Sequence, residues 1–135
     1  MGYKIEEVEG IGPVSAERLW TAGITTTEEL LEKCAAPKGR DTVSSATGLS
    51  ATQLLRWSNL ADLMRIKGVG PQYSELLEAA GVDTVKELCT RNAERLTARM
   101  EEINADKQLA KAAPALASVR DWIDQARNLQ PAMIH

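Results

Sequence analysis

Two short glycine-rich segments are the residues of this sequence best suited to bind an anion. Gly10-Ile11-Gly12-Pro13 and Gly68-Val69-Gly70-Pro71 share one pattern, 58 positions apart. Glycine accepts the positive φ angles of a tight turn, so each Gly-x-Gly predicts a hairpin whose backbone approaches a ligand closely. Each proline suits the first position of a helix, whose N-terminus carries about half a positive charge. The pattern therefore predicts two places that could each bind a backbone phosphate.

The charges that precede the two hairpins differ. Glu7 and Glu9 precede the first, whereas Arg65 and Lys67 occupy the corresponding positions before the second. Because a carboxylate repels a phosphate and a cation attracts it, we expect nucleic-acid contact only at the second hairpin. The first hairpin is expected to be structural or to face a protein. The expected contact residues are Arg65, Lys67, Gly68, Val69 and Gly70, and the structural hairpin is Gly10, Ile11, Gly12 and Pro13.

The residues of most catalytic and metal sites are missing. The only histidine is His135, the last residue, and terminal residues are usually poorly ordered. Cys34 and Cys89 are far apart with no C-x-x-C spacing, so neither a zinc site nor a dithiol redox site is indicated. Their number allows a disulfide, but we favour two reduced, buried thiols in a cytoplasmic protein. We expect no enzyme, no cofactor and no metal.

The hairpins belong to a longer internal repeat. Between positions 10 and 30, ten of 21 residues are identical to those 58 positions later, with glycines and prolines in register. In each copy an apolar pair closes a first helix, and a second helix runs from the proline to Gly23 or Gly81. A Thr-x-x-Glu capping box then opens a third, short helix. Such a connection is equally well explained as a compact joint between helices that binds nothing.

The segments outside the repeats also have helical patterns. Ser50 and Asn92 are expected to cap helices. The Gly- and Ser-rich stretch 37–48 has the weakest helical pattern and could hold a short helix over Asp41–Ala46. No alternating strand pattern occurs. The sequence therefore predicts an all-α fold, a compact bundle of about eight to nine short helices that contains two pseudo-symmetric repeats.

The three tryptophans have different predicted environments. Trp57 and Trp122 lie on apolar helical stripes and are predicted to be core residues, in a chain that has no phenylalanine. Trp20 aligns with Glu78 of the second copy, so it is predicted to lie nearer a surface or a seam between the repeats. The core is therefore expected to be mostly aliphatic.

The length and net charge of the chain are typical of one acidic domain. The chain has 135 residues, of which 44% are hydrophobic and 26% charged, with a net charge of -3. We expect a single domain over residues 1–135, with a first half, 1–62, of net charge -3 and a second half, 63–135, of net charge zero. No apolar run is long enough to cross a membrane. The net acidity disfavours binding of nucleic acid over the whole surface.

These residues resemble two known families. The glycine-proline segments and their apolar flanks resemble the helix-hairpin-helix motif over Ile5–Leu30 and Leu63–Leu88. This motif occurs in DNA polymerases, ligases and repair nucleases. The whole chain more closely resembles the bacterial domain of unknown function 4332 family. The likeness to that family lies in Leu54-Leu55-Arg56-Trp57, in the stretch from Asn59 to Pro71 and in Asp121-Trp122-Ile123.

Two functions follow from these features and from the resemblance. The first is a non-enzymatic binding module that contacts the backbone of DNA or RNA weakly and without sequence preference, through the second hairpin. The alternative is a protein–protein interaction or scaffold module that binds no nucleic acid. Neither function involves a membrane, and the sequence does not determine the oligomeric state.

Overall fold

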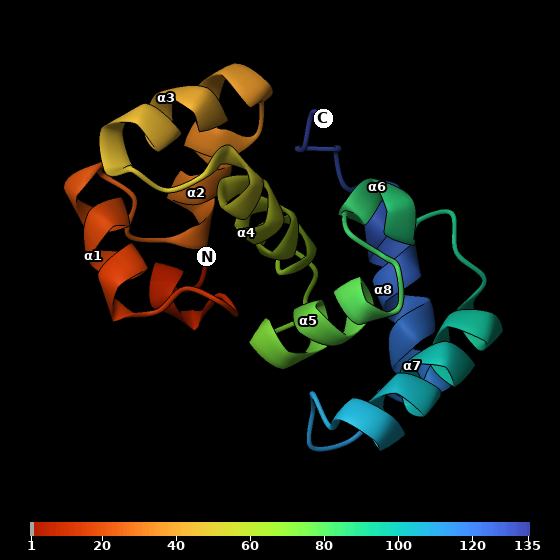
Figure 1. Ribbon diagram of the computed structural model, residues 1–135. Coiled ribbons are helices and arrows are strands. Elements are labelled where there is room, and N and C mark those ends of the chain that lie inside the picture. Colours follow the sequence, from red (N-terminus) through yellow and green to blue (C-terminus); the bar gives the residue numbers. More distant parts are fainter. Residues whose placement is uncertain (1) are drawn as a thin grey trace. The chain divides into compact units, whose positions relative to one another are not determined.

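The computed structural model describes residues 2–135, and helices form most of it (Figure 1). No β-strand occurs within that range, where Lys4 and Thr26 make an isolated antiparallel bridge. The predicted all-α class is confirmed. The elements in this range are the 3₁₀ helix η1 (Ile5–Glu7) and the helices α1 (Pro13–Thr21), α2 (Thr27–Cys34), α3 (Pro37–Thr47), α4 (Ala51–Leu63), α5 (Pro71–Ala79), α6 (Val85–Leu88), α7 (Ala93–Lys107) and α8 (Leu116–Asn128).

The chain divides into two units, each of which is described by itself. The first comprises the residues up to Asp62 together with Ala132–His135, and the second comprises Leu63–Pro131. The boundary after Asp62 coincides with the predicted boundary between the halves, but residues 132–135 belong to the first unit. The chain therefore passes from one unit to the other twice. The single domain over 1–135 stays a prediction.

Most helix-terminus signals of the repeat form as predicted, but the second capping box forms only in part. Pro13 and Pro71 are the first residues of α1 and α5. After each helix the chain turns at a glycine, and the next N–H donates to a leucine carbonyl five residues earlier, at 2.9 Å in both copies. This is the hydrogen bond of a Schellman ending.

The Thr26 side chain accepts from the N–H of Glu29 at 3.2 Å, which confirms the first capping box. In the second copy Thr84 accepts the N–H of Glu87 at 3.3 Å, whereas Oε2 of Glu87 accepts the N–H of Asp83 at 2.9 Å.

The apolar pair before each hairpin forms a tighter structure than the predicted helix. In the first copy the N–H of Val8 donates to the carbonyl of Ile5 at 3.2 Å, and the N–H of Ile11 donates to that of Val8 at 3.1 Å. In the second copy α4 ends at Leu63, and two three-residue turns follow, with N–H to carbonyl distances of 3.1 Å. The first copy thus has the 3₁₀ helix η1, and the second has two successive hydrogen-bonded turns, where an α-helical end was expected.

The possible helix over Asp41–Ala46 forms, and it is longer than expected. Helix α3 runs from Pro37 to Thr47, and Gly48 follows it as the C-cap with a φ of 77°. Packing requires the glycine at position 39, because a Cβ there would lie 2.0 Å from the backbone oxygen of Lys33 in α2. Gly39 therefore allows α3 to approach α2 closely, a role that the sequence pattern does not display.

Each unit has an aliphatic core that includes one tryptophan. Trp57 is 2% exposed and Trp122 is 3% exposed, so both predicted core positions are confirmed. In the second unit Tyr73 packs on Trp122 with ring centroids 5.3 Å apart. Trp20, in contrast, is 46% exposed on α1. Its predicted surface position is confirmed.

Candidate functional site

The second hairpin, residues 68–71, presents free backbone donors. Gly68 has a φ of 98°, and Gly70 is the N-cap residue of α5. Neither of these two N–H groups has an acceptor in the part of the chain that the structure describes. Val69 between them is buried, and its N–H donates to the carbonyl of Ile66 at 3.1 Å. The hairpin thus turns its apolar residue inward and leaves the two glycine amides available.

A glutamine from α8 holds the backbone that enters this hairpin. The N–H of Lys67 donates to Oε1 of Gln125 at 2.9 Å, and Nε2 of Gln125 donates to the carbonyl of Lys67 at 3.1 Å. The same Nε2 lies 2.9 Å from Oδ2 of Asp121. The backbone of Lys67 is therefore fixed and unavailable to a ligand, while its side chain is exposed.

Arg65 is less accessible than Lys67. Its side chain is half-buried, and its guanidinium donates to the backbone carbonyl of Gln130 at 2.8 Å. This contact holds the segment that follows α8. Of the two cations predicted at the second hairpin, the exposed one is Lys67.

Each hairpin has a tryptophan against its first glycine, a feature that sequence reasoning missed. A Cβ on Gly10 would lie 3.1 Å from Nε1 of Trp57, and a Cβ on Gly68 would lie 2.9 Å from Nε1 of Trp122. Both tryptophans come from the last long helix of their unit, α4 or α8. The spacing Leu54, Trp57, Ala61 recurs as Val119, Trp122, Ala126, and this match could have identified the contact.

The first hairpin, residues 10–13, is less acidic in space than along the chain. Helix α4 brings Arg56 to it, since a Cβ on Gly10 would lie 2.9 Å from a guanidinium nitrogen of that residue. Glu9, which precedes the hairpin, is half-buried. Its neighbours in sequence, Glu7 and Glu9, predicted that carboxylates surround this hairpin. The guanidinium of Arg56, 46 residues after Gly10, also lies beside it. Gly12 is open, with no atom within 4 Å of a Cβ built on it.

Residues suited to other chemistry are dispersed. Among residues 2–135 no group of three or more His, Cys, Asp and Glu side chains could hold a metal ion. Cys34 is buried and Cys89 half-buried, and both are free. Burial raises the pKa of the Cys34 thiol to about 11, which keeps it protonated and unreactive at neutral pH.

Among residues 2–135, every helix is too short or too polar to cross a membrane.

Comparison with known proteins identifies one family. The family model described as "Domain of unknown function (DUF4332)" matches residues 9–129, which include both hairpins and both buried tryptophans. No curated protein and no solved structure matches the chain.

Proposed function

The chain belongs to the DUF4332 family, and from its hairpin geometry we propose that it is a non-enzymatic module that binds the nucleic-acid backbone. The binding is weak, has no sequence preference and uses the second hairpin. One observation carries this proposal: the N–H groups of Gly68 and Gly70 have no acceptor within residues 2–135 and lie next to the exposed Lys67.

The chemistry of this site suits a phosphate oxygen. Two backbone N–H donors and the positive end of the nine-residue helix α5 attract an anion, and the Lys67 ammonium adds a full charge. Backbone donors and a lysine contact phosphates without reading bases. Arg65 donates one N–H to the carbonyl of Gln130, and the remaining donors of its guanidinium add to the positive charge before the hairpin. With one or two phosphates neutralised, each contributes a salt slope of about -0.9, so affinity is low at physiological salt.

The proposal includes the helix-hairpin-helix nature and the pseudo-symmetry of the two copies. Both copies have a proline at the helix start, a positive φ at the first hairpin glycine and a tryptophan beside that glycine. It also places the protein in the bacterial cytoplasm, which two free cysteines support.

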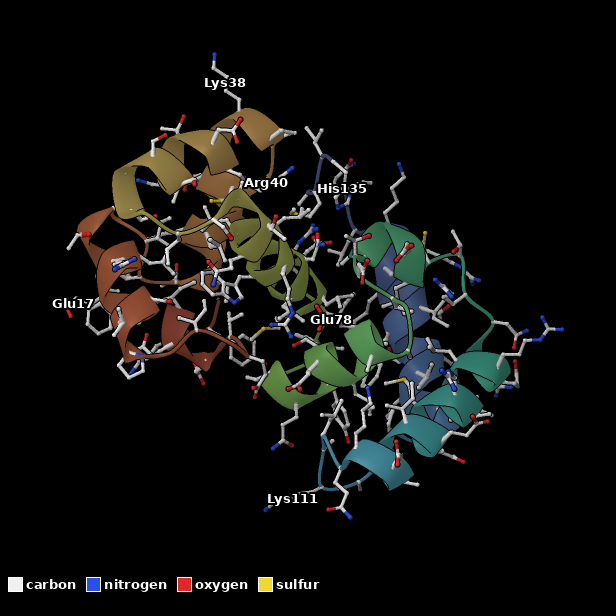
Figure 2. The ribbon with its side chains drawn as sticks, viewed as in Figure 1. Glu17, Lys38, Arg40, Glu78, Lys111 and His135 are labelled. Atoms are coloured by element: carbon white, nitrogen blue, oxygen red, sulfur yellow. The ribbon has the colours of Figure 1, made fainter. Side chains whose placement is uncertain are left out.

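The experiment is a fluorescence anisotropy titration of labelled duplex and single-stranded DNA and RNA at about 50 mM salt, where phosphate contacts are least screened. Lys67→Glu should weaken binding several-fold, because it places a carboxylate beside the two free amides. Lys38→Glu is the matched control, since Lys38 is exposed on α3 and points away from the ribbon (Figure 2). It should bind as the native protein does. Unchanged binding by Lys67→Glu, or no binding by the native protein, would refute the proposal.

Two exposed apolar side chains on α1 support a second candidate function, protein–protein interaction without nucleic acid. Val14 is 66% exposed and Trp20 is 46% exposed, both on α1 of the first unit. Tryptophan is enriched where one protein binds another. The same titration separates the two functions, because this one requires that the native protein bind neither DNA nor RNA.

A further inference from the structure

The second unit contains a hollow that is lined by cations. Its volume is about 480 Å³, and its lining contains three arginines and no carboxylate. A neighbouring hollow of about 240 Å³ shares Arg91 and adds two more arginines, with Asp124 as its acidic residue. We call the larger hollow the arginine groove. It is lined by Ala80, Thr90, Arg91, Asn92, Arg95, Leu96 and Arg99.

The three arginines of the groove lie at and just before the start of α7. Arg95 and Arg99 are four residues apart in the helix, so their side chains lie on one face with a rise of about 6 Å between them. Arg91 precedes the Asn92 cap and lines the same hollow. At the N-terminus of the helix, Asn92 accepts the N–H of Arg95 at 2.9 Å. The positive end of the helix adds to the charge of the side chains there.

Contacts within the protein use only some of the N–H donors of Arg91 and Arg99. Arg91 donates to the carbonyl of Gly81 at 2.9 Å and lies 4.0 Å from Glu87. Arg99 pairs with Glu102 at 3.3 Å, and both side chains are more than half exposed. A guanidinium has five N–H donors, so each of these contacts leaves donors available.

Arg95, the middle one in sequence, is the most available of the three arginines. Within residues 2–135 its guanidinium has no hydrogen-bond or ion-pair partner, and its side chain is exposed. The one acid of the first turn, Glu94, is bound to Arg120 instead. This contact lowers the pKa of Glu94, chiefly through the hydrogen bond from Arg120, and keeps its charge paired away from Arg95.

We propose that the arginine groove binds the phosphate groups of a linear polyphosphate ligand. The planar guanidinium fork matches phosphate oxygens in pairs. Three guanidinium groups that line one hollow fit several linked phosphates better than a single anion. A nucleic-acid strand and a free inorganic polyphosphate chain share this chemistry. The groove and the second hairpin are separate sites, so this inference does not depend on the hairpin.

The test uses Arg95→Glu in the full chain. This substitution reverses the charge of the middle arginine of the three. It also puts a glutamate three residues after the Asn92 cap, a spacing that favours the start of α7, so the variant should retain its helix. Circular dichroism and urea unfolding of the variant test whether α7 and the fold are retained. Lys38→Glu is the control for net charge. Arg95→Gln, which removes the charge without reversing it, should have an intermediate effect.

Two ligands are titrated at about 50 mM salt: a labelled 15-nucleotide oligothymidylate by anisotropy, and inorganic tripolyphosphate by calorimetry. Arg95→Glu should bind the ligand about tenfold more weakly or worse, whereas Lys38→Glu should bind as the native protein does. Native binding of the oligonucleotide alone identifies a strand as the ligand, and native binding of tripolyphosphate alone identifies a free chain. Binding of neither, or equal binding by Arg95→Glu and the native protein, overturns the proposal.

The hairpin and the groove can fail separately. Lys67→Glu should weaken binding at the hairpin and Arg95→Glu should weaken binding at the groove, so both variants are titrated with both ligands. If Lys67→Glu has no effect and Arg95→Glu does, the proposed hairpin contact is wrong and the groove stands. If only Lys67→Glu has an effect, the groove is wrong and the hairpin stands.

Discussion

The Cys34 thiol is a titratable group held wholly inside the first unit. It lies at the end of α2 and has no exposed surface. Burial disfavours the thiolate and raises the pKa from 9.0 to about 11, despite the opposing positive charges of Arg40 and Lys33. A thiol in this environment behaves as a small apolar side chain.

This pKa predicts a loss of stability in alkaline solution. The unfolded thiol loses its proton near pH 9, whereas the folded thiol keeps it until about pH 11. Between these values the unfolded state binds fewer protons, so the free energy of unfolding falls as pH rises, by up to about 2 to 3 kcal/mol. The contribution is fully present below pH 9. Urea unfolding measured from pH 8 to pH 11 tests this.

Two alanine variants isolate the effect of this thiol. Cys34→Ala should remove that part of the pH dependence, because no thiol remains to titrate. Cys89→Ala, which changes the half-buried free cysteine, should keep the native pH dependence. Identical slopes for the native protein and Cys34→Ala would show that another group is responsible.

At the scale of elements, local signals in the sequence were sufficient to predict most helix ends. Proline at a first position, asparagine or threonine at a cap and glycine after a last turn act within four or five residues, so the sequence displays them directly. Pro71, Thr26 and Asn92 all take their predicted roles. Helix α3 was underestimated because Gly39 serves a contact with α2, which a local pattern cannot reveal.

The contacts that other helices make with the hairpins could not be predicted, because they join residues that are far apart in the sequence. Gln125 binds Lys67 across 58 residues of sequence, and Arg56 approaches Gly10 from another helix. Such contacts depend on how helices pack inside a unit. Their prediction requires the positions of the helices in space, which the sequence repeat does not provide. The hairpin glycines could be located from sequence, but their charged neighbours could not.

The two glycines of the first hairpin should differ in their tolerance of alanine. Gly10 has a φ of 92°, and a Cβ there would lie 3.1 Å from Nε1 of Trp57. Gly12 has a φ of -85° and open space around a Cβ. Gly10→Ala should therefore lower the free energy of unfolding by about 1 to 2 kcal/mol. Gly12→Ala should change it by less than about 0.5 kcal/mol.

Urea unfolding of the two variants, side by side with the native protein, measures this difference. Equal stability of Gly10→Ala and Gly12→Ala would contradict the packing of Trp57 against the hairpin.

At the scale of the whole molecule, charge is unevenly distributed. The chain carries a net charge of -3, yet five arginines line two neighbouring hollows of the second unit. Net charge therefore says little about what this protein binds, because a ligand meets a local surface. The sequence displayed the i, i+4 spacing of Arg91, Arg95 and Arg99 but not the hollow beside them.

A buried arginine ties the end of the chain to the first unit. Arg40 is 5% exposed, and its guanidinium donates to the carbonyls of Cys34, Ala35 and Ile134 at 2.9, 3.0 and 2.9 Å. The N–H of Ile134 donates to Ala35 at 2.8 Å. His135, expected to be poorly ordered, lies with its Nε2 3.2 Å from Oδ1 of Asn59.

Removal of this cation should destabilise the protein strongly. Arg40→Met keeps an apolar stem but leaves the carbonyls of Cys34 and Ile134 without this donor, whereas Ala35 keeps the N–H of Ile134, so the free energy of unfolding should fall by about 2 to 4 kcal/mol. Lys38→Met, on the exposed face of the same helix, should change it by less than about 0.5 kcal/mol. Chemical denaturation of both variants measures the contrast. Native-like stability of Arg40→Met would mean that water replaces the guanidinium without cost.

The docking of residues 132–135 on the first unit has a consequence for synthesis. A ribosome makes the chain from its N-terminus, and domains generally begin to fold in that order. The second unit, Leu63–Pro131, is continuous and can acquire all its residues before residues 132–135 are made. The first unit is started first but completed last, because Arg40 has no Ile134 carbonyl to bind until the ribosome has passed residue 134. A chain truncated after Pro131 would therefore contain every residue of the second unit, but its first unit would lack the Ile134 carbonyl that Arg40 binds.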